Sequence, residues 1–411
     1  MPRAPRPVDA LERASRWASA AEPALVVVGV MAFYAVYVTS RIQKHSVLWF
    51  VHLGHRFLTA STTSDVITPS LGWQSKLGYD GQYYFALAAD PAHAHDYMGD
   101  KAGYIYARAF YPALSRAASL GSQGALPYAM LAVNLASVAL GTLAVALWLR
   151  RRGAPVWPAA LFGLYPGLVF SVFRDLTEPL AFALAASAVL VFDSRVRHRL
   201  AISAVIFALA LLTRETVAPF ALAAAAALVA EDRGRGGWRS ARVWRRGVLF
   251  ALAACAPLVV WRAVVTAYLH LPTQETGHDS GWAVPFHGIL SYRPFDDEHR
   301  LIVWTIVLPT LASLLGAVVL LVARRAQIVA VLLIVNALLY VVFLPETVDI
   351  DYDAAARAAI GVVLASLYCV PAWWRGGGRV LVGVGAFTWS ILWYLAVASH
   401  LGVPGMPLIA Q

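Results

Sequence analysis

Long apolar runs, separated by short charged segments, dominate the sequence. Hydrophobic residues make up 60% of the 411 residues and charged residues only 14%, whereas a soluble globular domain carries about 25% charged residues. A transmembrane helix needs about 20 consecutive apolar residues because the hydrocarbon core of a bilayer is about 30 Å thick. The pattern therefore predicts an all-α, polytopic integral membrane protein.

We expect about 11 transmembrane helices, within a range of roughly 10 to 13, in a single integral membrane domain that covers residues 1–411. The first apolar run, residues 24–40, has no clear signal-peptide cleavage site after it, so we interpret it as an uncleaved first span. A long polar segment, residues 41–124, separates it from the remaining spans in residues 125–400. Those predicted spans are 125–149, 156–173, 178–193, 199–213, 216–230, 246–269, 301–323, 326–344, 356–374 and 379–400.

Charge is distributed unevenly between alternate connections. Most of the 33 Lys and Arg fall in the N-terminal tail and in every second connection, among them Arg150–Arg152 and the basic stretch Arg233–Arg246, and most of the 23 Asp and Glu fall in the others. Cytoplasmic loops of membrane proteins carry the excess of Lys and Arg. The N-terminus is therefore predicted to be cytoplasmic and the segment 41–124 extracytoplasmic. The net charge of +10 then indicates membrane lipids as partners of the basic stretch, and no nucleic acid.

The extracytoplasmic segment contains the sequence GYDGQYYF at residues 78–85. Here Asp80 follows an aromatic ring and precedes a glycine, and further rings come after it. A glycine permits a turn or a close approach to a ligand, and rings offer flat apolar faces for lipids or sugars. Two other interpretations stay open, namely an interfacial aromatic belt with a solvated Asp80, and an Asp80 that caps a helix beginning at Gly81. The end of the segment, residues 104–120, is amphipathic and predicts an interfacial helix.

More charged residues fall at the predicted extracytoplasmic ends of the later spans, where a charge is costly unless it is paired or hydrated. The main ones are Arg174, Asp175, Glu178, Arg214 and Arg357. The two acids are three residues apart, which could place them on one helical face. The arginines are candidate phosphate ligands, although snorkelling or pairing with a nearby acid such as Glu215 would explain them equally. Arg262 lies deeper in its span, where we expect it to pair with an acid of this face.

Two histidine-containing stretches raise the question of a metal. His93, His95 and Asp96 lie together in the polar segment, and His278 and Asp279 fall in a later loop. Such a group could hold a divalent metal, but hydrated loop histidines produce the same pattern. We therefore assign no metal ligand and no cofactor from the sequence.

The order of these motifs resembles the GT-C superfamily of membrane glycosyltransferases, which use polyprenyl-phosphate sugars. The chain shows a first span, then YDGQYY at residues 79–84 and FYP at 110–112, and then a many-helix domain. It is most similar to the PIG-V-type mannosyltransferases and their bacterial relatives, which carry Trp-Asp in the first outer loop and a Ser/Thr-Glu-Ser motif opening a later span. Tyr79-Asp80 stands in place of the first motif, Thr177-Glu178-Pro179 in place of the second, and Thr213-Arg214 matches a common Thr-Arg. The resemblance covers roughly residues 20–220.

The resemblance implies a GT-C fold and an enzyme of the bacterial inner membrane. Such an enzyme moves a sugar, with mannose the best guess, from a polyprenyl-phosphate donor to a hydroxyl of an envelope glycan or glycolipid acceptor, with inversion, on the extracytoplasmic side. The reaction needs one carboxylate as base, worth about 10²–10⁴-fold, and positive charge to neutralise the departing phosphate. The catalytic candidates are Asp80, Asp175 and Glu178, and the substrate-binding candidates are Tyr79, Gln82, Tyr83, Arg174, Arg214 and Arg357.

Two other functions remain open at this point. One is a transporter or flippase of a lipid-linked or anionic substrate, and the other is a non-catalytic partner in an envelope assembly. Transporters usually contain internal repeats and polar residues near the middle of the membrane, whereas this sequence shows no repeat and its polar residues fall at predicted span ends. An Asp80 that lines a cavity with Asp175 and Arg214 would favour the enzyme, and an Asp80 on an exposed loop tip would favour the assembly partner.

The distribution of arginines generates a prediction about topology. A reporter fused after Gly153 should report a cytoplasmic location, and a reporter inserted within residues 90–100 an extracytoplasmic one, because the first follows an arginine triplet and the second lies in the acid-rich segment. Paired alkaline phosphatase and fluorescent protein fusions measure both. The reverse result at both positions would place the Asp80 segment in the cytoplasm.

Overall fold

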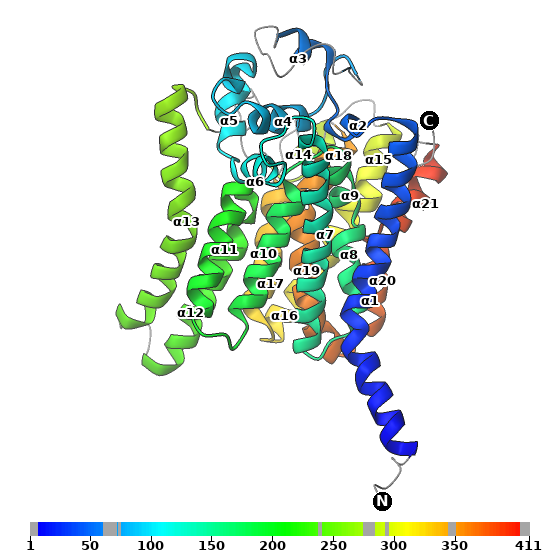
Figure 1. Cartoon of the computed structure of the whole chain (residues 1–411). Helices are drawn as coiled ribbons and strands as arrows, with labels where there is room; N and C mark the ends of the chain where they lie inside the picture. Colours follow the sequence, from blue (N-terminus) through cyan, green and yellow to red (C-terminus); the bar gives the residue numbers. More distant parts are fainter. Residues whose placement is uncertain are drawn as a thin grey trace, which may run out of the picture.

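The computed structural model describes residues 7–60, 72, 75–236, 241–273, 284–291, 296–343 and 351–402. Within these ranges the chain is helical, and its only β-type pairing is an isolated bridge between Gly54 and Ser75. The predicted all-α class is therefore confirmed. The long helices stand side by side in a bundle, and the short helices that follow the first one gather at one end of it (Figure 1). We call this end, which carries Asp80, the Asp80 end.

The helices have the following bounds. The first half of the chain contains α1 (Pro7–Lys44), α2 (Leu48–Val51), α3 (His55–Ala60), α4 (Gly81–Ala89), α5 (Ala102–Tyr106), α6 (Phe110–Ala118), α7 (Leu126–Arg151), α8 (Ala160–Leu164), α9 (Pro166–Phe173), α10 (Glu178–Phe192) and α11 (Arg199–Thr213). The second half contains α12 (Ala218–Gly236), α13 (Ala241–Leu269), α14 (His287–Ser291), α15 (Asp297–Ile302), α16 (Leu308–Val322), α17 (Gln327–Ala337), α18 (Tyr352–Ala358), α19 (Ile360–Arg375), α20 (Arg379–Thr388) and α21 (Ile391–Leu401). Single turns of tighter or wider helix include η4 (Trp157–Ala159), η5 (Glu215–Val217), η6 (Val303–Val307) and η7 (Leu338–Val342).

Several of these helices are long and apolar enough to cross a membrane. Four continuous stretches of the described chain meet that criterion, and they are Ala21–Lys44, Leu126–Arg151, Val243–Leu269 and Asp297–Val322. The number rises to six if each of two bent pairs, α18 with α19 and α20 with α21, is one span. Three further apolar stretches, Glu178–Phe192, Arg199–Thr213 and Gln327–Val342, are shorter. A membrane protein is thus supported, whereas the count of about 11 spans stays a prediction.

Two segments that the sequence predicts as continuous are divided in the structure. The predicted span 156–173 is divided because Tyr165 is extended, with ψ at 130°, as expected for a residue before a proline. Its hydroxyl donates a hydrogen bond of 2.9 Å to the carbonyl of Ala356. A Cβ on Gly167 would lie 2.3 Å from the same carbonyl oxygen, so α9 and α18 approach closely here. The predicted interfacial helix 104–120 is likewise divided, into α5 and α6.

The polar segment is fastened to the bundle next to Asp80. The side chain of Gln82 is buried, and its Oε1 accepts a hydrogen bond of 2.9 Å from the backbone N–H of Gly54. Its Nε2 donates one of 3.1 Å to the carbonyl of Leu77. A Cβ on Gly81 would lie only 2.1 Å from the carbonyl oxygen of Arg174, so only glycine lets the start of α4 rest against the end of α9. These contacts fix the position of Asp80 relative to the bundle.

Candidate functional site

The carboxylate of Asp80 is accessible and has cations on two sides. Asp80 occupies the residue before α4, but its side chain makes no capping hydrogen bond. Its Oδ1 lies 3.9 Å from Nζ of Lys101, its Oδ2 lies 3.9 Å from Nη1 of Arg357, and the side chain is 29% exposed. The interpretation of Asp80 as a helix cap is therefore wrong, because its oxygens are turned toward the two cations.

A buried carboxylate gathers two of the predicted arginines. Glu178 is the first residue of α10, and its side chain is 0% exposed. Its Oε1 lies 3.1 Å from Nη1 of Arg214 and 3.3 Å from Nη1 of Arg357. Since Arg357 also faces Asp80, the predicted residues Asp80, Glu178, Arg214 and Arg357 form one connected group, which we call the outer ion cluster.

Tyr79 and Arg174 extend this cluster. The guanidinium carbons of Arg174 and Arg357 lie 5.1 Å and 5.2 Å from the centre of the Tyr79 ring, a distance at which a cation is attracted by the ring. Nη2 of Arg174 also lies 3.7 Å from Asp353, and its Nη1 donates a hydrogen bond of 2.6 Å to Nδ1 of His52. Burial, together with the charge of Arg174, lowers the pKa of His52 to about 4, so the imidazole is neutral at pH 7 and can accept this bond.

The other two substrate-binding candidates, Gln82 and Tyr83, make contacts within the protein. Both polar ends of Gln82 are used by backbone groups of Gly54 and Leu77, so its amide has a structural role in holding the loop. The Tyr83 ring meets Phe57 edge-on at 5.3 Å between ring centres. Nζ of Lys101 lies 5.2 Å from the centre of the same ring. Tyr83 therefore places Lys101 beside Asp80.

Asp175 does not join the outer ion cluster. It lies before α10 in the left-handed region, with φ at +47°, so it does not share a helical face with Glu178. Its Oδ1 accepts a hydrogen bond of 3.3 Å from Nδ2 of Asn134, which also donates one of 2.9 Å to the hydroxyl of Tyr111, and Oδ2 has no hydrogen-bond partner. Burial raises the pKa of Asp175 to about 8. A carboxyl group that is buried and protonated at pH 7 cannot serve there as a base.

A second group of charges adjoins the first, and of its members only Arg108 was not marked by the sequence. Arg108 is buried, and its Nη2 and Nε lie 2.6 Å and 3.2 Å from the two carboxylate oxygens of Glu215. Arg262 lies 3.5 Å from the same carboxylate, which confirms that it pairs with an acid of this end. Burial would raise the pKa of Glu215, but the charge and hydrogen bonds of Arg108 hold it below the usual range. We call these three residues the groove ion cluster. Two guanidinium groups share one carboxylate here, so positive charge is in excess.

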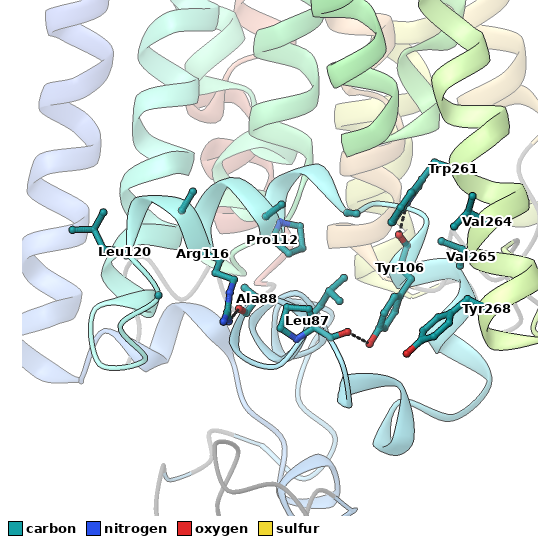
Figure 2. A pocket seen from close by; sticks show the side chains of 15 residues that line it. Leu87, Ala88, Tyr106, Pro112, Arg116, Leu120, Trp261, Val264, Val265 and Tyr268 are labelled. Atoms are coloured by element: carbon teal, nitrogen blue, oxygen red, sulfur yellow. Dashed lines mark hydrogen bonds between the residues drawn. The ribbon is translucent and has the colours of Figure 1, made fainter.

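An apolar groove begins beside the groove ion cluster. One hollow of about 650 Å³ lies between α6 and α13, and a second of about 680 Å³ adjoins it. Both are lined by Ala109, Ala113, Trp261 and Val264. Figure 2 shows Trp261, whose Nε1 donates a hydrogen bond of 2.9 Å to the carbonyl of Tyr106. Arg108 and Arg262 are the sequence neighbours of the lining residues Ala109 and Trp261, so the chain joins the groove ion cluster to the groove at two positions.

The predicted metal candidates do not converge. Nδ1 of His93 lies 3.1 Å from Asp90, and Nε2 of His95 lies 3.3 Å from Asp96. No three His, Cys, Asp or Glu side chains in the described ranges are arranged to hold a metal ion. His278 and Asp279 lie outside the described residues.

Comparison of the chain with protein-family models, with curated proteins and with solved structures finds no match.

The buried carboxyl group of Asp175 generates a prediction about pH. Its pKa is about 8 in the folded protein against 3.8 for the free group, so the stability that it contributes is present below about pH 4 and is lost as the pH rises toward 8. Asp175→Asn removes this dependence. In detergent, the melting temperature of the variant relative to wild type should therefore rise between pH 5 and pH 8.

The control for this measurement is Asp297→Asn, at an exposed aspartate that pairs with Arg300 at 2.8 Å. Its melting temperature relative to wild type should stay nearly constant over the same range. A constant difference for Asp175→Asn as well would mean that Asp175 is already ionised at pH 5.

Proposed function

We propose that this protein is a membrane glycosyltransferase that transfers a sugar from a polyprenyl-phosphate donor to a hydroxyl of an envelope glycan or glycolipid. The observation that carries the proposal is the position of Asp80. Its accessible carboxylate faces Arg357 at 3.9 Å, Glu178 and Glu215 hold further arginines at the same end of the bundle, and an apolar groove is lined by the sequence neighbours of Arg108 and Arg262. Base, phosphate ligands and lipid site are the three parts that such a transfer requires.

Asp80 is the base in this proposal. Its carboxylate accepts the proton of the acceptor hydroxyl as the oxygen forms a bond to the anomeric carbon. The bond between that carbon and the phosphate oxygen breaks, and the phosphate leaves with the electron pair. A single displacement of this kind inverts the anomeric centre, whereas retention usually needs a second carboxylate as nucleophile. Glu178 is 0% exposed and held by two arginines, so it orients guanidinium groups and does not attack.

The two ion clusters supply charge for the departing phosphate. In the outer ion cluster Arg214 and Arg357 are held by Glu178, and in the groove ion cluster Arg108 and Arg262 are held by Glu215. Guanidinium groups that are already fixed stabilise developing charge without having to reorganise during the reaction. Their planar donors also match the oxygens of a phosphate.

The groove favours a lipid-linked donor. Hollows of about 650 Å³ and 680 Å³ with apolar walls fit a hydrocarbon chain, and each buried methylene contributes about 0.8 kcal/mol. A sugar nucleotide has no hydrocarbon chain that could occupy such a surface. Mannose is the sugar that the motif resemblance implies. The extracytoplasmic side of a bacterial inner membrane follows from the arginine distribution and that resemblance.

A transporter or flippase of a lipid-linked substrate is the alternative. Its site is expected near the middle of the membrane, at broken helices, whereas both ion clusters lie at the Asp80 end of the bundle. Proteoliposomes loaded with polyprenyl-phosphate mannose distinguish the two functions, because an enzyme forms a new glycosidic bond and a flippase moves the lipid unchanged.

Replacement of the proposed base tests the mechanism. Asp80→Asn keeps the shape but cannot accept a proton, so turnover should fall by about 10²-fold or more, with little change in donor binding. Asp80→Glu should recover little, because a displacement of about 1 Å can cost about 10²-fold. The measurement is transfer of labelled mannose from polyprenyl-phosphate mannose in membranes. Because Asp80 makes no capping bond, the Asn variant should be as stable as wild type. An active, stable Asp80→Asn protein would falsify the assignment.

Replacement of the phosphate ligands tests the second part. Arg214→Ala and Arg357→Ala should each lower the rate of transfer from the polyprenyl-phosphate donor. Arg214→Lys and Arg357→Lys should restore only part of that rate, because lysine lacks the planar guanidinium fork. A matched control is Arg300→Ala, since Arg300 pairs with the exposed Asp297 at 2.8 Å outside both ion clusters. Full activity in both Ala variants, with folding confirmed by gel filtration, would remove these arginines from the mechanism.

A further inference from the structure

A third hollow lies at the opposite end of the bundle from Asp80. Its volume is about 490 Å³. The C-terminal ends of α7, α10 and α19 surround it, together with α12 between residues 220 and 230 and the start of α17. We call it the arginine-rimmed pocket, because Arg152, Arg324 and Arg375 all line it. It shares no residue with the apolar groove or with either ion cluster.

The inner walls of the pocket are aromatic and apolar. The rings of Trp148 and Phe220 meet the ring of Tyr368 edge-on, with centres 4.8 Å and 6.3 Å apart. Val329 and Leu332 complete the wall on the side of α17. Ligand pockets generally have volumes of about 300–1,000 Å³ and mostly apolar linings with a few polar groups, and this pocket fits that description.

Tyr368 belongs to the buried wall of the pocket. It is 3% exposed, and its hydroxyl is buried and makes no hydrogen bond in the structure. Because the hydroxyl is not accessible, Tyr368 lines the pocket through its other atoms.

The rim carries more positive charge than the carboxylates of the described residues neutralise. Nε of Arg152 donates a hydrogen bond of 2.9 Å to Asp193. Among the described residues, neither Arg324 nor Arg375 pairs with a carboxylate. Arg324 also holds φ at +52°, a conformation that is uncommon for a residue other than glycine. Two unpaired guanidinium groups therefore stand at the mouth of an apolar pocket, which is complementary to an anion with a hydrocarbon tail.

We propose that the arginine-rimmed pocket binds an anionic phospholipid. The phosphate lies on Arg324 and Arg375, and one acyl chain lies in the pocket against the aromatic wall of Trp148, Phe220 and Tyr368. Arginines at the membrane surface attract anionic headgroups, and the apolar, aromatic walls require a chain that a soluble phosphate lacks. The site is independent of the proposed glycosyl transfer.

Lipid titration of the full-length protein in neutral detergent tests the proposal. Native mass spectrometry should count a tightly bound dioleoyl phosphatidylglycerol, and dioleoyl phosphatidylcholine should bind more weakly because it has no net charge. Arg324→Gln and Arg375→Gln should each weaken phosphatidylglycerol binding by about fivefold, the worth of one surface arginine. The control, Arg195→Gln with Arg197→Gln, removes two positive charges, more than either single variant, from the exposed α10–α11 connection outside the pocket and should change binding little.

A second set of measurements tests the acyl chain. Ala227→Phe fills the pocket that Ala227 lines and keeps both arginines, so phosphatidylglycerol binding should fall although the charge is unchanged. Glycerol phosphate should fail to displace the lipid. Equal loss in the control arginine pair, or unchanged binding in Ala227→Phe, or displacement by glycerol phosphate, would each overturn the proposal. Unfolding curves without added lipid show whether each variant folds, and the single Arg→Gln variants decide the question if Ala227→Phe does not.

Discussion

The buried carboxylate of Glu178 is the constraint on which the Asp80 end depends. Taking charges out of water costs several kcal/mol per ion unless they are paired, and Glu178 pairs with Arg214 and Arg357 at 3.1 Å and 3.3 Å. These three residues belong to α10, the α11–η5 connection and α18, which are far apart in sequence. Removing any one of them leaves the others as uncompensated buried charges. Three parts of the chain are therefore held in one geometry by a single side chain.

The polar segment adds Asp80 to this frame through backbone contacts. Gly81 rests on the carbonyl of Arg174, where a Cβ would be 2.1 Å away, and Gln82 binds the loop to Gly54. Since these residues flank Asp80, the carboxylate is fixed relative to Arg357 without a hydrogen bond of its own to the backbone. A carboxylate that is positioned by its neighbours keeps its oxygens free, which is the arrangement that the proposed role of Asp80 as a base requires.

The sequence was sufficient to predict the helical membrane class. It also predicted that Asp80, Glu178, Arg214 and Arg357 would gather, because charged side chains at helix ends on one side of a membrane need a partner or water. It could not separate Asp175 from Glu178. The two side chains point in different directions because the backbone of Asp175 is left-handed, with φ at +47°. The spacing of the two acids in the sequence does not reveal this conformation. The sequence also did not identify Arg108 as a site residue. An arginine in a predicted interfacial helix is expected to snorkel, and its partner Glu215 is 107 residues away.

The two ends of the bundle neutralise their arginines in different ways. At the Asp80 end carboxylates hold the guanidinium groups, so these groups are fixed in place before any ligand arrives. At the opposite end Arg324 and Arg375 have no carboxylate partner among the described residues. A fixed, paired arginine suits a transient phosphate that must leave after each turnover, because binding replaces only part of its interactions. An unpaired arginine at the membrane surface suits a lasting counter-ion, and the lipid bilayer supplies one at high local concentration. The contrast in pairing therefore separates the proposed substrate phosphate from the proposed structural lipid.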